Sequence, residues 1–117
     1  MTSKLIQRYF KNELNFFTKA IPKRFQNDPK TLERLSIDNG RFALFIRTII
    51  GSAGIEKMPF SKKAGVSSTT IRKILNRKGR RSITVRTYVS LLKACSELLD
   101  DLTNDKVAAR FKKEDRL

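Results

Sequence analysis

Hydrophobic residues recur every three or four positions over most of the chain, which is the spacing that buries one face of an α-helix. Residues 4–21 form the first such segment, and Pro22 is expected to end it because proline cannot continue a helix. Residues 41–50 form another, closed by Gly51 and Gly54. The apolar arc predicted for the first helix consists of Leu5, Ile6, Tyr9, Phe10, Phe16, Phe17, Ala20 and Ile21.

A longer helix is predicted from residue 85, because Thr84 can cap its first turn. Its inward stripe consists of Val85, Tyr88, Val89, Leu92, Cys95 and Leu99. A further helix is predicted ahead of residue 41, with Asp28 as its N-cap and Pro29 as its first residue. Leu32, Leu35 and Ile37 supply its apolar side.

Two short segments bear on whether the fold contains strands as well as helices. Asn39-Gly40 reads as a break between helices, since both residues favour turns. The only β-branched cluster, residues 83–85, is too short to compel a sheet. The chain is therefore expected to be all-α.

The centre of the chain predicts a helix-turn-helix. A short helix over residues 57–64 is followed by Gly65, which reaches the left-handed backbone angles of a tight turn without strain. Ser67 can then cap a helix over 68–76. Ile71, Ile74 and Leu75 would hold this helix to the core, and Val66 would point into the angle between the two helices. The outward side chains are Ser68, Thr69, Arg72, Lys73 and Asn76.

The net charge of +15 is unevenly distributed. No acidic residue lies between Glu56 and Glu97, whereas solvated surfaces usually mix both signs. A basic loop, "NRKGRRS" over residues 76–82, directly follows the predicted helix 68–76. This distribution indicates a polyanionic partner, and it favours nucleic acid over an anionic membrane. We expect the cations of this loop to bind a phosphate backbone. These cations are Arg77, Lys78, Arg80 and Arg81.

The composition argues against most catalytic chemistry. The chain has no histidine and a single cysteine, Cys95, so Ser-His, Cys-His, disulfide and His-metal sites are excluded. The acidic residues Asp100, Asp101 and Asp105 are read as a charged helix end rather than a magnesium site. We expect the protein to be no enzyme and to bind no cofactor and no metal.

The chain shows no signal-peptide pattern and no run of ~20 apolar residues, so a cytoplasmic, nucleoid-associated protein is expected.

The outward set on helix 68–76 suits the major groove of DNA, which admits one α-helix. Small hydroxylated residues at its start allow close approach to the bases or phosphates. Arg72 or Lys73 can donate to guanine O6 and N7, and Asn76 can pair with adenine or reach a phosphate.

These residues resemble the phage repressor/Cro-type helix-turn-helix family, also called XRE-like, over residues 41–99. The family pattern places an alanine-glycine-valine-serine turn before isoleucines at helical spacing and a later glycine. The chain departs from it at Phe60 and Ser61, where the family favours leucine and alanine, and at Lys57 and Pro59 in the first turn of the second helix. The matching residues are Gly54-Ile55, Ala64-Gly65-Val66-Ser67, Ile71, Ile74 and Gly79.

The resemblance implies a compact five-helix, lambda-repressor-like domain whose third helix lies in the major groove. By the same resemblance Lys57, Lys62 and Arg86 are candidates for phosphate contacts. The groove candidates that it implies are Ser67, Ser68, Thr69, Arg72, Lys73 and Asn76.

Three segments are predicted in the domain organisation. Residues 1–37 form a helical extension, 38–99 the DNA-binding domain, and 100–117 a charged tail. Glu13 falls inside the apolar arc of the first helix, where a carboxylate suits a protein interface in which a cation pairs with it. The first helix can pack on its own domain or on a second copy, and we hypothesise that residues 4–37 build a dimer contact or a partner-docking surface. A homodimer is expected because two recognition helices read a palindrome.

The predicted function is a sequence-specific, double-stranded DNA-binding transcription regulator, a repressor on a phage or mobile element. Two alternatives remain open from the sequence. One is an addiction-module antitoxin that binds its own operator, and the other is a DNA-bending or recombination accessory protein. No membrane partner is expected.

Overall fold

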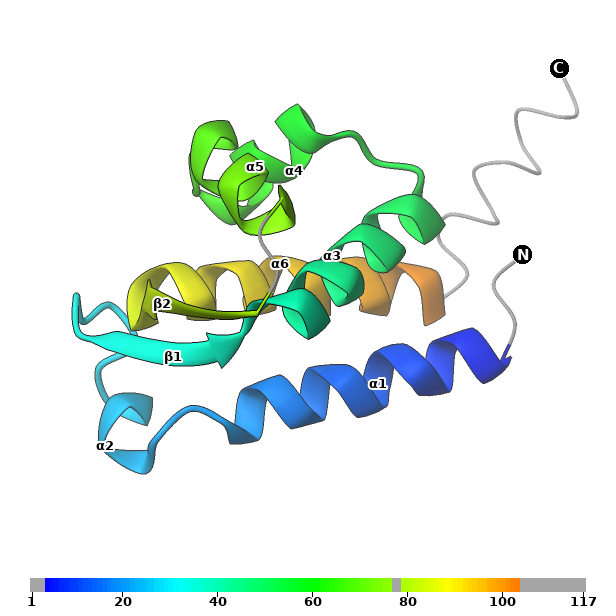
Figure 1. The fold of residues 1–117 in the computed structure, drawn as a ribbon. Coiled ribbons are helices and arrows are strands. Elements are labelled where there is room, and N and C mark those ends of the chain that lie inside the picture. The colour runs from blue at the N-terminus through cyan, green and yellow to red at the C-terminus, as the bar shows by residue number, and fades with distance from the viewer. Residues whose placement is uncertain (1–3, 77–78, 104–117) are drawn as a thin grey trace, which may run out of the picture.

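The structure, a computed structural model, describes residues 4–76 and 79–103 of the 117-residue chain. Within these residues six helices and two strands follow one another (Figure 1). The helices are α1 (Lys4–Lys19), α2 (Lys23–Gln26), α3 (Asn39–Ala53), α4 (Lys57–Ala64), α5 (Ser68–Asn76) and α6 (Val85–Thr103), and the strands are β1 (Arg34–Asp38) and β2 (Arg80–Thr84). The described chain is mostly helical, as its hydrophobic spacing predicts.

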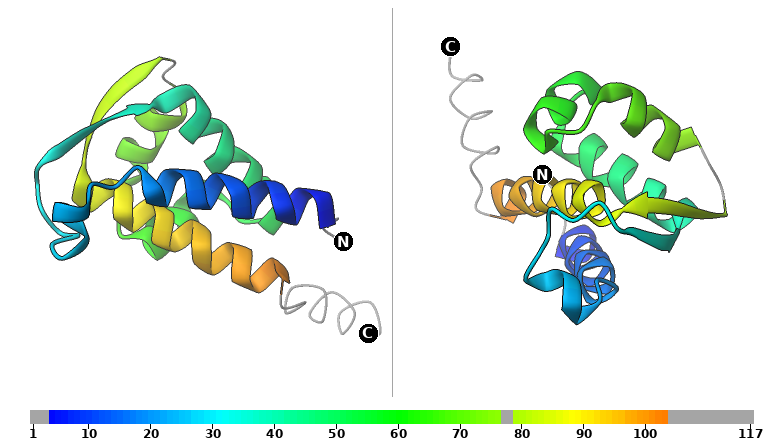
Figure 2. Two further views of the ribbon diagram at one scale, coloured as in Figure 1. Left: turned by 90° about the horizontal axis from the view of Figure 1, so that it is seen from below. Right: turned by 90° about the vertical axis from the view of Figure 1, so that its left-hand side faces the viewer.

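The helices α3 and α6 form the centre of the molecule. Helix α3 contacts α1, α5 and α6, and α6 contacts α1, α3 and α4. The inward residues of α3 repeat at helical spacing, and Phe42, Phe45, Ile46 and Ile49 are each at most 1% exposed. In the right-hand view of Figure 2, α4 and α5 lie above this centre and α1 and α2 below it. Helices α1 and α5 are therefore on opposite sides of the molecule.

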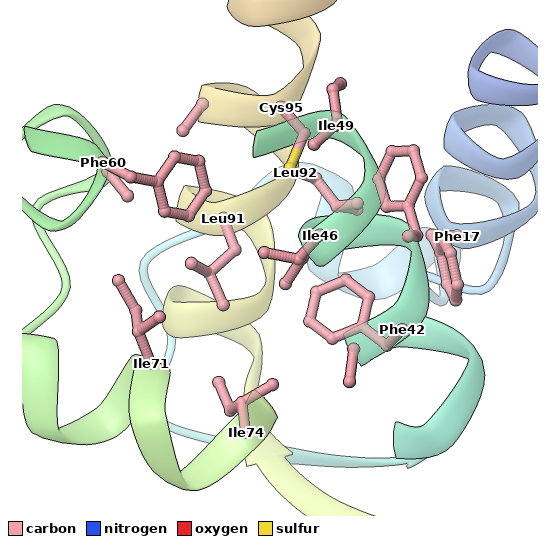
Figure 3. Packing of buried hydrophobic residues seen from close by; sticks show 14 of the residues in the cluster. Phe17, Phe42, Ile46, Ile49, Phe60, Ile71, Ile74, Leu91, Leu92 and Cys95 are labelled. Carbon is pink, nitrogen blue, oxygen red and sulfur yellow. The ribbon is translucent and has the colours of Figure 1, made fainter. Parts of the chain in front are cut away.

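Helix α6 carries the predicted inward stripe. Tyr88 and Cys95 of this stripe are fully buried, and the Tyr88 ring centroid lies 5.2 Å from that of Phe42 in α3. Leu91, which was not predicted, is also fully buried, and Figure 3 shows it with Cys95 in the same cluster as Ile46 and Ile49 of α3. The Tyr88 hydroxyl donates to the backbone carbonyl of Phe17 in α1. Burial raises the pKa of the Cys95 thiol to about 12, so it is a neutral core residue.

Helix α1 is part of this core. It ends at Lys19, before the predicted end at residue 21, and Pro22 precedes α2. Phe10 and Phe17 are 0% and 2% exposed, and the Phe17 ring centroid lies 5.1 Å from that of Phe42. The predicted apolar arc is wrong at four positions, since Leu5, Ile6, Phe16 and Ala20 are exposed.

Glu13 lies on the buried side of α1, as predicted, but its partner belongs to the same chain. Arg41 of α3 donates to both oxygens of the Glu13 carboxylate, from Nε at 2.9 Å and from Nη2 at 2.8 Å. Hydrogen bonding to Glu13 raises the pKa of Arg41. The guanidinium also lies 3.6 Å from the ring centroid of Phe16. The prediction that Glu13 meets a cation across an interface is therefore wrong, because this pair joins α1 to α3.

The segment after α2 is the largest correction to the predicted fold. Residues 28–37 do not form a helix capped by Asp28. Instead β1 pairs antiparallel with β2, with Ser36 opposite Ser82. Ile37 and Ile83 are buried beneath this two-stranded ribbon, whereas alternate residues face outward. The all-α prediction is wrong to this extent, because the partner strand that selects an extended backbone lies far along the chain.

The predicted break at Asn39-Gly40 is wrong for a related reason. Asp38 ends β1 and caps α3, since its Oδ1 accepts from the backbone N–H of Arg41 at 3.2 Å. Asn39 and Gly40 are the first two residues of α3. Asn39 is fully buried, and its Nδ2 donates to the carbonyl of Ile74 in α5 at 2.7 Å.

Both predicted segment boundaries fall within secondary-structure elements. The boundary after residue 37 falls inside β1, and α1 shares one hydrophobic cluster with α3 and α6. Helix α6 continues to Thr103, past the predicted boundary at residue 100. Residues 104–117, which make up most of the predicted tail, lie outside the described residues.

Replacing Gly51 with alanine is expected to raise the free energy of unfolding by about 0.4–1 kcal/mol. Gly51 lies within α3, and a Cβ atom added there meets nothing within 4 Å. Alanine therefore reduces the freedom of the unfolded chain without strain. The same substitution at Gly54 is the control, because its φ of +66° disfavours any side chain and the expected effect is destabilising. Urea unfolding of both variants checks the two signs, and a loss of stability in Gly51→Ala contradicts this account.

Candidate nucleic-acid interface

The turn between α4 and α5 has the predicted geometry. Gly65 ends α4 with φ 68° and ψ 27°, in the left-handed region that glycine tolerates best. The backbone N–H groups of Gly65 and Val66 both donate to the carbonyl of Ser61, at 2.9 and 3.2 Å. Val66 is buried. These bonds fix the direction in which α5 leaves the turn.

Phe60 and Ser61, two of the residues at which the chain departs from the family pattern, are both accommodated around this turn. Phe60 is fully buried and belongs to the same cluster as Ile71 and Leu91 (Figure 3). The Ser61 hydroxyl donates to the carbonyl of Val66, so it is satisfied within the turn. A phenylalanine and a serine therefore fill positions where the family pattern has leucine and alanine.

Ser67 caps α5, as predicted. Its Oγ accepts from the backbone N–H of Thr70 at 3.2 Å and lies 2.9 Å from the Thr70 hydroxyl. The Ser67 side chain is thus engaged at the helix start. Of the hydroxyls predicted for the groove, Ser68 and Thr69 remain in place to meet a ligand, and Thr69 is the more exposed.

One face of α5 is exposed and basic. The exposed residues of α5 recur at the spacing of one helical face, and they are Thr69, Arg72, Lys73 and Asn76. The buried residues lie on the opposite face, and they are Ile71, Ile74 and Leu75. Among the described residues, neither Arg72 nor Lys73 forms an ion pair with a carboxylate. Figure 1 shows α5 at the opposite side of the molecule from α1. The predicted recognition helix is therefore accessible along its basic face.

A shallow pocket of about 210 Å³ brings α4 and α5 together at their N-terminal ends. It is lined by Lys57 and Met58 of α4 and by Ser68, Thr69 and Arg72 of α5. Lys57, predicted only from the resemblance, thus lies beside three groove candidates. Met58 is 57% exposed and was not predicted, because a lone methionine in a short helix carries no sequence signal.

Arg47 is a second residue that sequence reasoning missed. Its Nη2 donates to the carbonyl of Leu75 at 2.6 Å and lies 3.4 Å from Oδ1 of Asn76. This contact satisfies the carbonyl end of α5, where a cation is favoured by the helix dipole. The Arg47 guanidinium also donates to the side-chain oxygen of Asn76. The side-chain NH2 group of Asn76 has no protein partner among the described residues. This NH2 group therefore suits a phosphate oxygen.

The predicted basic loop 76–82 is only partly a loop. Arg77 and Lys78 lie outside the described residues. Arg80 and Arg81 belong to β2, and successive residues of a strand point to opposite faces. Arg80 is exposed, and Arg81 is partly buried on the face that carries Ile83. The prediction that residues 76–82 form a loop is therefore wrong at Arg80 and Arg81, which lie in a strand, and only Arg80 of the two is exposed.

The remaining predicted phosphate contacts belong to the helices α4 and α6. Lys62 is exposed on α4. Its neighbour Lys63 instead pairs with Glu97 of α6, with Nζ 3.1 Å from the carboxylate. Arg86 is exposed in the first turn of α6 and borders a pocket of about 240 Å³ that also contacts Ser67 and Thr70 of the α5 N-terminus.

A scan against protein-family models and searches of curated proteins and solved structures find no match to this chain. Within residues 4–76 and 79–103, no helix combines the length and apolar character needed to cross a lipid bilayer. The same residues contain no group of three or more His, Cys, Asp or Glu side chains placed to hold a metal ion. The function is therefore inferred from the geometry and charge of α5 and its surroundings.

Proposed function

We propose that this chain is a sequence-specific double-stranded DNA-binding regulator of the lambda-repressor-like type, with α5 as its recognition helix. The observation that carries the proposal is the exposed face of α5, which holds two cations and two small hydroxylated residues. Helix α5 contains no acidic residue, and neither cation pairs with a carboxylate in the part of the chain that the structure describes. A helix that protrudes in this way fits the major groove, whose width admits one helix.

Each part of the surface has a distinct role in this proposal. Arg72 and Lys73 donate to acceptors on guanine edges, and Thr69 approaches the bases from the start of α5. Lys57 and Arg86 lie near the α5 N-terminus and bind flanking phosphates, and these contacts position the helix without reading sequence.

Binding of the protein over a promoter excludes polymerase, so repression is the simplest regulatory outcome. A homodimer places two copies of α5 on a palindrome, and the activity needs no catalysis or cofactor.

The direct test replaces Arg72 with alanine. We expect binding to the preferred duplex, found by selection from random fragments, to weaken by about 1–3 kcal/mol and base preference to relax at one position. The matched control is Arg8→Ala, because Arg8 is an exposed arginine on α1 at the opposite side of the molecule. Titration of fluorescent preferred and scrambled duplexes at one fixed salt concentration measures both variants.

Two results oppose the proposal in different ways. Equal losses for Arg72→Ala on preferred and scrambled duplexes mean that α5 touches only phosphates. Absence of any duplex binding by the wild-type chain at low salt removes DNA as the partner.

A further inference from the structure

Met58 is an exposed apolar side chain within the basic candidate interface. It is the second residue of α4, and 57% of its surface is exposed. Figure 1 places α4 and α5 side by side, and the two helices contact each other. The neighbouring Lys57 is exposed, as are Arg72 and Lys73 of α5. Apolar residues that are exposed singly are common, so the position of Met58, rather than its exposure, is informative.

Met58 lines the shallow pocket of about 210 Å³ at the N-terminal ends of α4 and α5. The other lining residues are Lys57 of α4 and Ser68, Thr69 and Arg72 of α5. Thr69 and Arg72 are three positions apart on the exposed face of α5. The pocket therefore combines an apolar thioether chain with the hydroxyls and the guanidinium that are the groove candidates.

The helical geometry of α4 directs Met58 away from the core. Phe60 and Ala64 are four positions apart and both buried, so they mark the inward side of α4. Met58 precedes Phe60 by two residues, which is about 200° around the helix and therefore on the outward side. Side chains of a helix lean toward its N-terminus, and this end of α4 borders Ser68 and Thr69 at the start of α5.

One group in the major groove is suited to an apolar side chain. Guanine, adenine and cytosine present hydrogen-bond donors and acceptors there, whereas thymine presents a C5-methyl group beside its O4 acceptor. Covering this methyl group with a thioether chain removes apolar surface of both partners from water. Methionine is unbranched and polarisable, so it adapts to the position of the methyl group.

We propose that Met58 is a specificity residue that contacts the methyl group of one thymine in the duplex. The proposal rests on the function proposed above, because it requires α5 to lie in the major groove. Met58 and Arg72 line one small pocket, so this thymine lies within about two base pairs of the base that Arg72 reads, at about 3.4 Å per stacked base. Helix α4 thereby adds a base contact next to the phosphate contact of Lys57.

The first experiment replaces each thymine of the preferred duplex, one at a time, with deoxyuridine, which lacks only the C5-methyl group. At one thymine near the Arg72 position, the wild-type chain is expected to bind the uracil duplex about fourfold more weakly, the value of one methyl group returned to water. Met58→Ala is expected to bind the thymine and uracil duplexes equally at that position. Fluorescence titration at one fixed salt concentration measures the four affinities.

Further variants separate an apolar contact from a change of shape. Met58→Leu keeps an apolar side chain and should retain most of the preference for thymine over uracil. Met58→Gln has a similar length but a polar end, so it should lose this preference. Leu5→Ala is the matched control, because Leu5 is exposed and apolar but lies on α1, at the opposite side of the molecule from α5. Urea unfolding of each variant checks that it is folded.

The outcomes separate the role of Met58 from that of α5. If the wild-type chain binds thymine and uracil duplexes equally at every position, while Arg72→Ala still relaxes base preference, the thymine contact is overturned and the function of α5 stands. If Met58→Ala binds more weakly but keeps the thymine preference, the methyl contact belongs to another side chain. A sensitive thymine farther than about two base pairs from the Arg72 position contradicts the shared pocket. Absence of any duplex binding by the wild-type chain removes both proposals.

Discussion

Phe17→Ala is expected to lower the free energy of unfolding by about 3–5 kcal/mol, the largest effect that we predict. Phe17 is 2% exposed, and its ring centroid lies 5.1 Å from Phe42 and 5.4 Å from Phe45. Removal of the ring leaves a cavity between α1 and α3 that close-packed neighbours fill only in part. Urea unfolding followed by circular dichroism measures the loss.

The neighbouring Phe16 offers a matched control. It is 45% exposed, and its ring contacts the guanidinium of Arg41 and the ring of Phe17. Because nearly half of this side chain is already in solvent, Phe16→Ala should cost about 1 kcal/mol or less. Repeating both measurements over a hundredfold range of protein concentration adds a second check. A loss in Phe17→Ala that depends on concentration indicates that α1 is stabilised by a partner copy, whereas packing within one chain predicts no dependence.

Gly65→Val is expected to cost about 2–3 kcal/mol, because valine resists a φ of +68°. A Cβ atom at this position meets nothing within 4 Å, so the cost comes from the backbone and not from a clash. Gly65→Asn is the control, since asparagine tolerates the left-handed region and should cost about half as much or less. Unfolding by urea measures both variants.

The same two variants test how the turn relates to DNA binding. The exposed face of α5 is unchanged by a substitution at Gly65, so the ratio of affinities for preferred and scrambled duplexes should stay constant in the folded protein. Equal costs for valine and asparagine contradict the left-handed turn as the source of the effect.

Much of the helical part of the fold could be predicted because its signals are local. The bounds of α4 and α5 follow from Gly65 and Ser67, which act on backbone groups within one turn. The exposure of Arg72 and Lys73 follows from the spacing of the isoleucines that α5 buries. These features depend on backbone angles and hydrogen bonds between near neighbours, which a sequence displays directly.

The ribbon could not be predicted in the same way. Leu35 and Ile37 fit a helix or a strand when considered alone, because a short apolar run has no distinctive period. Their conformation is selected by β2, and the bonds from Arg34 and Arg80 to serines of the opposite strand join residues 48 and 44 positions apart. The exposed positions Leu5 and Phe16 likewise show that periodicity marks an apolar face without saying how much of it is covered.

The sequence by itself determined the two short helices joined at Gly65, the caps at Ser67 and Thr84, and a basic stretch free of acidic residues. The tertiary structure alone decided that α1 packs into the core, that Glu13 pairs with Arg41, and that Arg80 and Arg81 point to opposite faces. The physical reason is the number of positions along the chain that separate the interacting residues. Caps and turns act between residues a few positions apart, whereas strand pairing, ion pairs between helices and core closure depend on which distant segments meet.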